Sequence, residues 1–137
     1  MSKYLLDTHT WIWLMSGDNN LPENIVDKLN KAIPNSDIKV SLISAWEVSL
    51  LESKGRLRFD INCLDWINKA MSQPGITTAD LNAKILYESS RLPGDIHGDP
   101  FDRALIASAR ILGLVLVTKD SKILKYGKDG FVKTLGF

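Results

Sequence analysis

The segment Leu114-Val-Leu-Val-Thr118 restricts the fold more than any other part of the chain, because it is a continuous apolar run of strand-forming residues. Strands with this pattern are buried on both faces, as in parallel sheets that helices cover. Short apolar segments at residues 3–6 and 38–42 share this character, and stretches with helical spacing of apolar residues separate them. The sequence therefore predicts an α/β fold with a mostly parallel central sheet flanked by helices.

Proline, glycine and polar capping residues divide the rest of the chain into elements. Pro22 suits the first turn of a helix, and Gly55 and Gly113 suit the ends of two others. We expect helices at residues 8–15, 22–33, 44–53, 62–72, 79–90, 99–113 and 121–126, and a last strand near 131–135.

Length and composition describe an ordinary globular chain. Its 137 residues, without a repeat or a long linker, predict one domain over residues 1–137. A hydrophobic content of 45% allows a core without disulfides, and the single cysteine, Cys63, cannot form an internal bridge. No apolar run approaches membrane-spanning length, and Asp7 interrupts the N-terminal apolar segment early. We therefore expect a cytoplasmic protein with no membrane association.

Acidic residues recur at one predicted edge of the sheet. Asp7 directly follows the segment 3–6, and Asp120 comes just after Thr118. Glu47 falls in the first turn of the helix predicted after residues 38–42, and Asp99 and Asp102 begin the helix that precedes the last long strand. Because ligands bind at the carboxyl ends of the strands in such sheets, this edge is the candidate site.

Each acid taken alone also has a structural explanation. Ser44 and Glu47 have the spacing of a capping box, and Asp99 with Pro100 has the pattern of a helix start. Asp7 and Asp120 suit turns. Taken together, however, these carboxylates repel one another unless a positive charge holds them, which indicates a divalent cation.

The residue types favour a hard cation over zinc. Mg²⁺ and similar ions prefer carboxylate oxygens, and the chain has no Cys/His cluster. We expect His9 to pack beside a strand end and His97 to be an ordinary loop residue. Carboxylate-held metals hydrolyse phosphodiesters without a covalent nucleophile, and the chain shows no convincing Ser-His-Asp or Cys-His arrangement and no glycine-rich phosphate loop.

Four acidic segments follow one another and cover nearly the whole chain: Leu5-Leu-Asp-Thr-His-Thr-Trp11, Ser41-Leu-Ile-Ser-Ala-Trp-Glu47, His97-Gly-Asp-Pro-Phe-Asp-Arg-Ala-Leu-Ile-Ala107 and Leu116-Val-Thr-Lys-Asp120. In this order they resemble the acidic motifs of PIN domains, and in particular of VapC-like ribonuclease toxins of type II toxin–antitoxin systems. One position departs from the pattern: Ile123 stands where the family often carries an aromatic residue.

The resemblance implies a PIN-like three-layer fold and a metal-dependent endoribonuclease that cleaves single-stranded or loop RNA. It implies that Asp7, Glu47, Asp102 and Asp120 are catalytic and bind Mg²⁺ or Mn²⁺. Asp99 is either a further ligand or only the helix cap, and we favour the cap. Thr8 and Thr118 are expected to orient Asp7.

The resemblance also implies RNA, a cognate antitoxin and a second copy of the chain as partners. Trp11, Ile12 and Trp13, and the helix with Trp46, Leu50 and Leu51, are either partner surface or core. The residues from Arg110 to the end are locally basic, so they are either an RNA-facing surface or a solvated one. The side chains expected to contact the RNA backbone are Arg56, Arg58, Lys119 and Lys122.

Two other functions remain open from the sequence. The chain is alternatively a catalytically weak PIN module that binds RNA or a partner, although all four acids are present. A receiver-type phosphate domain is a poorer match, because that class needs an acid pair near the first strand and a lysine after the fifth.

Overall fold

A parallel sheet forms the centre of the computed structural model, which describes residues 2–137. Within that range every strand pairing is parallel and the strand order is β3-β2-β1-β4-β5. The predicted α/β class with a parallel sheet is thereby confirmed. The strands are β1 (Tyr4–Leu6), β2 (Ile38–Ser41), β3 (Ile76–Ala79), β4 (Val115–Thr118) and β5 (Thr134–Gly136).

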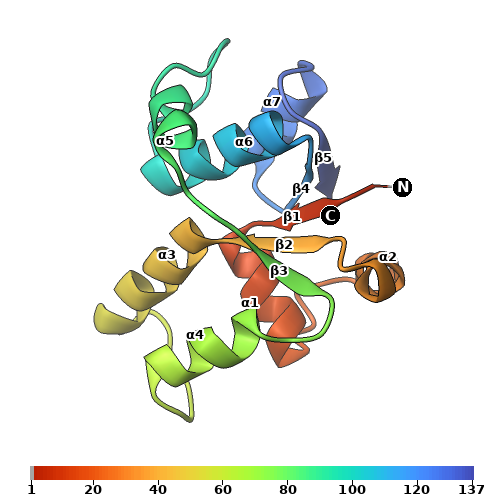
Figure 1. The fold of residues 1–137 in the computed structure, drawn as a ribbon, viewed down its shortest axis with the longest axis vertical. Helices are drawn as coiled ribbons and strands as arrows, with labels where there is room; N and C mark the ends of the chain where they lie inside the picture. Colours follow the sequence, from red (N-terminus) through yellow and green to blue (C-terminus); the bar gives the residue numbers. More distant parts are fainter. Residues whose placement is uncertain (1) are drawn as a thin grey trace.

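Helices cover both faces of this sheet (Figure 1). In that view α5, α6 and α7 lie above the strands, α1, α3 and α4 lie below them, and α2 lies at the right. The helices are α1 (Thr8–Ser16), α2 (Glu23–Ala32), the 3₁₀ turn η1 (Ile33–Asn35), α3 (Leu42–Ser53), α4 (Cys63–Met71), α5 (Ala83–Ser89), α6 (Pro100–Leu112) and α7 (Ser121–Lys128). The part of the chain described here contains no helix with both the length and the apolar character needed to cross a membrane.

The central strands are buried on both faces, as their continuous apolar sequence predicts. Side chains alternate across a strand, so Leu5 packs with residues of α6 and α7 while Leu6 packs with residues of α1, α2 and α4. Both leucines are fully buried. Trp11 and Ile12 also belong to the core, which decides against a partner-binding role for this pair.

Several element boundaries differ from the sequence prediction. The edge strand β3 was not predicted, and the helix expected from residue 79 begins only at Ala83, where Asn82 caps it. In β3 only Ile76 and Ala79 are buried, so its sequence alone carries a weak signal, and pairing with β2 makes it a strand. Smaller shifts place Pro22 at the N-cap of its helix, extend α7 to Lys128 and move the last strand to residues 134–136.

The strand order creates a topological switch point at the carboxyl edge of the sheet. The chain proceeds from β1 outward to β2 and β3, and then returns to β4 on the opposite side of β1. Connections from β1 and β4 therefore leave the sheet toward opposite sides, and such a switch point is where α/β sheets bind ligands. Asp7 directly follows β1 and Asp120 comes two residues after β4, so both lie beside this point.

Candidate functional site

Two of the predicted acids cap helices at the switch point. The Asp7 Oδ1 atom accepts a hydrogen bond of 2.8 Å from the Thr10 backbone N–H at the start of α1. The Asp120 Oδ1 atom accepts hydrogen bonds from the backbone N–H groups of Lys122 at 2.9 Å and Ile123 at 3.0 Å, at the start of α7. These backbone donors, together with the helix dipoles, stabilise negative charge at this edge.

Thr118 connects the two acids. Its hydroxyl donates to Asp7 Oδ2 at 2.5 Å, and the same oxygen accepts the Asp120 backbone N–H at 3.0 Å. The side chain of Thr118 is fully buried, so neither bond competes with solvent. The expectation that Thr118 orients Asp7 is confirmed. The same expectation for Thr8 is wrong, because its buried hydroxyl hydrogen-bonds Ser44 Oγ at 2.9 Å.

Glu47 reaches the site from the second turn of α3, not from its first. The helix begins at Leu42, and Ser41 is its N-cap, accepting a hydrogen bond from the Ile43 backbone N–H at 3.1 Å. The predicted capping box between Ser44 and Glu47 is therefore wrong, since Ser44 is a buried partner of Thr8. The Glu47 carboxylate is released from any capping role and remains half-buried beside the other acids.

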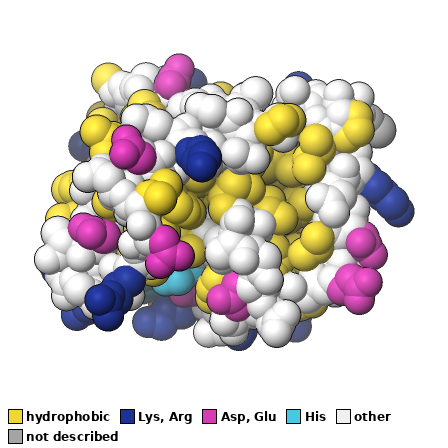
Figure 2. All heavy atoms as spheres, turned by 90° about the horizontal axis from the view of Figure 1, so that it is seen from below, with side chains coloured by type: hydrophobic (Ala, Val, Ile, Leu, Met, Phe, Trp, Pro, Cys, Tyr) yellow, Lys and Arg dark blue, Asp and Glu magenta, His cyan; other side chains and the backbone are white. Residues whose placement is uncertain are grey.

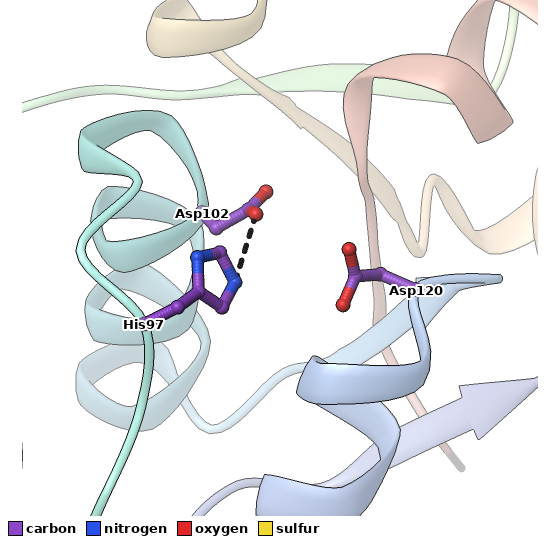
Figure 3. Close-up of side chains that lie close together, drawn as sticks. All are labelled: His97, Asp102 and Asp120. Carbon is purple, nitrogen blue, oxygen red and sulfur yellow. Dashed lines mark ion pairs between the residues drawn. The ribbon is translucent and has the colours of Figure 1, made fainter.

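Asp99 and Asp102 come from the start of α6. Asp99 is the N-cap: its Oδ1 accepts the backbone N–H groups of Phe101 at 2.9 Å and Asp102 at 3.1 Å, and Pro100 follows it in the first turn. The preferred interpretation of Asp99 as a helix cap is confirmed, while a further role as ligand stays open. Asp102 does not bond back to the cap, and its Oδ2 lies 3.2 Å from His97 Nε2 (Figure 3).

The pKa values of Asp102 and Glu47 are raised by burial and by the charges of other predicted acids. The pKa of Asp102 is raised from 3.8 to about 7, first by burial and then by the negative charges of Asp99, Asp120, Glu47 and Asp7. Burial also raises the pKa of Glu47, against a hydrogen bond from Thr8 and the charge of His9, while Asp99 and Asp7 raise it further. The charges of the other four acids thus reach Asp102, while of the predicted acids the group of ligand atoms within 4.8 Å of one another in residues 2–137 contains Asp102 and Asp120 but not Asp7 or Glu47.

His97 is the site residue that the sequence interpretation missed. It is a loop residue as expected, but its imidazole points toward Asp102 of α6 (Figure 3). Asp120, which precedes α7, faces the same two side chains from the opposite side. Ligand atoms of His97, Asp102 and Asp120 all lie within 4.8 Å of one another. The sequence feature that could have identified His97 is its position two residues before the helix cap Asp99. His9 instead lies exposed in α1 with its ring 5.7 Å from that of Trp13.

The donor set fits a hard divalent cation. In Asp99 and Asp120 the backbone N–H groups bond only to Oδ1, which leaves Oδ2 without a hydrogen bond from any described residue. Asp102 and Glu47 accept no backbone hydrogen bond within residues 2–137, and both have raised pKa values. Partly buried carboxylates with free oxygens are the ligands that Mg²⁺ and Mn²⁺ prefer. A cation would relieve the repulsion that raises these pKa values.

The predicted basic side chains are exposed, whereas the apolar hollows of the surface lie apart from the site acids. Arg56, Arg58, Lys119 and Lys122 are all exposed, and Lys119 Nζ lies 5.9 Å from the centre of the Trp13 ring. On the face seen from below in Figure 2, apolar side chains gather in a hollow that the charged groups surround. Hollows on the α1 and α4 side are lined by residues such as Leu14, Met15, Trp66 and Ile76, and by none of the site acids.

Comparison with known proteins gives consistent matches. Residues 4–129 match the PIN domain family. Ribonuclease VapC22 of Mycobacterium tuberculosis is 28% identical over 124 residues, which are 90% of this chain and 91% of that protein. The fold resembles that of DNA-bound VapBC from Salmonella typhimurium at 19% identity and a TM-score of 0.70, with 99% of this chain and 98% of that chain covered. VapBC-1 from nontypeable Haemophilus influenzae matches at 20% identity and a TM-score of 0.67, with 97% and 96% covered.

We expect Thr118→Val to destabilise the protein. The substitution removes the donor to Asp7 and the acceptor for the Asp120 N–H inside a buried site, which costs about 1–3 kcal/mol of unfolding free energy. Urea unfolding followed by tryptophan fluorescence measures the change. Thr78→Val on the exposed face of β3 is the matched control and should change stability little. Equal effects of the two substitutions would contradict the linking role of Thr118.

The raised pKa of Asp102 predicts a specific pH dependence of stability. Since the folded protein holds this proton up to about pH 7 and the unfolded chain releases it near pH 4, the metal-free protein loses stability as pH rises through that interval. Asp102→Asn removes the repulsion, so in EDTA the variant should be more stable than the wild type at pH 8, with the difference shrinking toward pH 4. Urea unfolding at both pH values tests this, with the exposed Asp27→Asn on α2 as control. A variant less stable than the wild type at pH 8 would contradict it.

Proposed function

The chain belongs to the PIN-domain family, and we propose that it is a metal-dependent endoribonuclease that cleaves phosphodiester bonds of single-stranded or loop RNA. The observation that carries the proposal is the convergence of Asp7, Glu47, Asp102 and Asp120 at the switch point of the sheet. The name of the curated relative, a ribonuclease, supports the same activity. We also propose that residues 1–137 form a single PIN domain.

Asp7, Asp102, Asp120 and Glu47 would hold the cation, which we propose is Mg²⁺ or Mn²⁺, and Asp99 Oδ2 is the remaining candidate ligand. When bound, the ion supplies charge neutralisation at the phosphate and lowers the pKa of a bound water. The protein contributes fixed geometry: Asp7 is held by Thr10 and Thr118, and Asp120 by the first turn of α7. Such orientation reduces the cost of assembling the reacting groups.

Glu47 is suited to help remove the proton of the attacking water. Its pKa is raised by burial and by the charges of Asp99 and Asp7, which makes its carboxylate a stronger base than an exposed one. Unlike Asp7, Asp99 and Asp120, it caps no helix, so proton transfer to its carboxylate breaks no backbone hydrogen bond of a helix cap. The departure at Ile123 leaves Asp120 undisturbed, because the Ile123 N–H still bonds it and its side chain is fully buried.

Exposed basic side chains and a partly buried tryptophan near the site support RNA as the substrate. His9, Trp13 and Lys119 form a contiguous group that begins two residues after Asp7, and Lys122 follows Asp120. Lysine pairs with phosphate, and aromatic rings stack on unpaired bases, so this group suits a single strand entering the acidic edge. We propose the same role for Arg56 and Arg58, two exposed residues of the loop that follows α3.

We further propose that the protein is the toxin of a toxin–antitoxin pair, acts in the cytoplasm and forms a homodimer. Support comes from the similarity to Ribonuclease VapC22 and to the VapBC structures. The apolar surface available to a partner includes Leu42, Trp46 and Tyr87, which are exposed by 42%, 55% and 56%. Trp46 packs on Phe101 of α6 with ring centres 5.1 Å apart, so a partner bound there would lie close to the acids.

A catalytically weak PIN module that binds RNA or a partner is the alternative function. The retention of all four acids, with the raised pKa of Asp102, favours catalysis, because carboxylates held together in this way reduce stability without a cation. Calorimetry that detects no Mg²⁺ or Mn²⁺ binding would favour the alternative.

We expect Asp7→Asn to lower RNA cleavage by about 100-fold or more while the fold persists. Asparagine caps helices as well as aspartate but is a poor metal ligand, so the substitution keeps the cap and removes the ligand. Because it also replaces the oxygen that accepts the Thr118 hydroxyl, urea unfolding verifies that the variant is folded. The assay is cleavage of a labelled RNA with single-stranded loops, in Mg²⁺ or Mn²⁺ and in EDTA.

Asp27→Asn, the same chemical change on the exposed face of α2, should leave cleavage unchanged. Cleavage by the folded Asp7→Asn variant at the wild-type rate, or cleavage that persists in EDTA, would refute the proposed mechanism. Absence of cleavage by the wild type in either metal, together with absent metal binding, would favour the binding module.

A further inference from the structure

We propose that His97 is a positioning residue of this site: its Nε2–H donates a hydrogen bond to Asp102 and orients that carboxylate, and the imidazole is not itself a metal ligand. The inference rests on the proposed metal site but concerns a different residue and a different interaction. A ligand atom of His97 lies within 4.8 Å of those of Asp102 and Asp120, so the residue could either bind the metal or orient the acid. The proposal assigns it the second role.

The hydrogen bonds of the ring assign its tautomer. The Asp99 backbone N–H donates to His97 Nδ1 at 3.3 Å, so Nδ1 carries a lone pair. In a neutral imidazole the proton is then on Nε2. A metal ligand needs the opposite arrangement at Nε2, which would place a proton on Nδ1 against the Asp99 N–H and break that bond.

The Nε2–H group points toward one carboxylate. Nε2 lies 3.2 Å from Asp102 Oδ2, is shielded from solvent and has no aligned hydrogen-bond partner among the described residues. Because the terminal torsion of an aspartate is soft, a small rotation of Asp102 completes the bond at little cost. An unsatisfied buried donor is costly, so this bond has a clear driving force. It fixes Oδ2 and leaves Oδ1 for the cation.

Hydrogen bonds from Arg103 hold the loop that carries His97 in this position. The Arg103 Nε donates to the Ser89 carbonyl at 2.8 Å, and its Nη1 donates to the carbonyls of Ile96 and His97, both at 3.2 Å. These bonds tie both ends of the loop between α5 and α6 to the first turn of α6. Since Arg103 directly follows Asp102, the helix turn that carries the acid also places the imidazole against it. The rigid, planar guanidinium suits such a multiple contact.

The tautomer can be measured directly. The chain has two histidines, so a long-range proton–nitrogen correlation spectrum of ¹⁵N-labelled protein shows two rings, and His9→Gln assigns them. We expect His97 to carry its proton on Nε2 at neutral pH, and to keep it there when saturating Mg²⁺ is added. A proton on Nδ1 in either state, or loss of the Nε2 proton on Mg²⁺ binding, overturns the proposal.

Substitutions test the positioning role without an activity assay. His97→Gln keeps a side-chain N–H donor, whereas His97→Ala removes it. We expect Mn²⁺ affinity, measured by calorimetry, to fall about tenfold in His97→Ala and to remain near that of the wild type in His97→Gln. His9→Gln is the matched control, and urea unfolding verifies that each variant is folded. Wild-type affinity of His97→Ala, or equal loss in both His97 variants, overturns the proposal.

The outcomes for the two proposals are distinguishable. Normal Mn²⁺ binding with the expected tautomer, but without RNA cleavage, contradicts the endoribonuclease function and leaves the role of His97 standing. Conversely, metal-dependent cleavage with a proton on Nδ1 supports the endoribonuclease and refutes the positioning role. If the wild type binds no cation, the metal-site proposal fails and the orienting role fails with it.

Discussion

Electrostatic repulsion among carboxylates gathered at one sheet edge is the constraint on which the rest of this structure depends. Burial and four neighbouring acids raise the pKa of Asp102 to about 7, so the folded chain pays for holding these groups together. The fold limits that cost by placing helix N-termini at the same edge, where Asp7, Asp99 and Asp120 each accept backbone N–H groups. The parallel sheet makes this possible, because its strand ends and the following helix starts meet on one side.

The same side chains therefore serve stability and the proposed chemistry at once. Asp99 and Asp120 cap their helices through Oδ1 and keep Oδ2 free, which lets one carboxylate hold a helix and face a cation. Thr118 bonds both Asp7 and the Asp120 backbone, so β4 fixes the spacing of two acids that lie more than a hundred residues apart in the chain. Arg103 and His97 act on the other side, where α6 and its preceding loop fix Asp102. Glu47 differs, since no cap restrains its carboxylate.

The surroundings of the acidic edge divide into two kinds of surface. His9, Trp13 and Lys119 offer an aromatic and basic approach beside Asp7, which suits a single-stranded polyanion. Trp46, supported by Phe101, offers an apolar approach beside α6, which suits a protein partner. A partner that covers Trp46 and Phe101 would lie beside Glu47 and Asp102, which is where an inhibitor of the proposed nuclease would act.

Local sequence determined the central strands, most helix starts and the identity of the acids. The apolar run before Thr118 demands burial on both faces, and Asp99-Pro100 specifies a helix start through bonds within three residues. Tertiary structure decided the features that depend on distant partners. Strand β3 exists because β2 pairs with it, and Ser44, which has the spacing of a capping box with Glu47, instead lies inside α3 and is bonded to Thr8 of another helix. The burial of Trp11 and the approach of His97 to Asp102 likewise depend on contacts that only the closed fold creates, since no spacing along the chain encodes them.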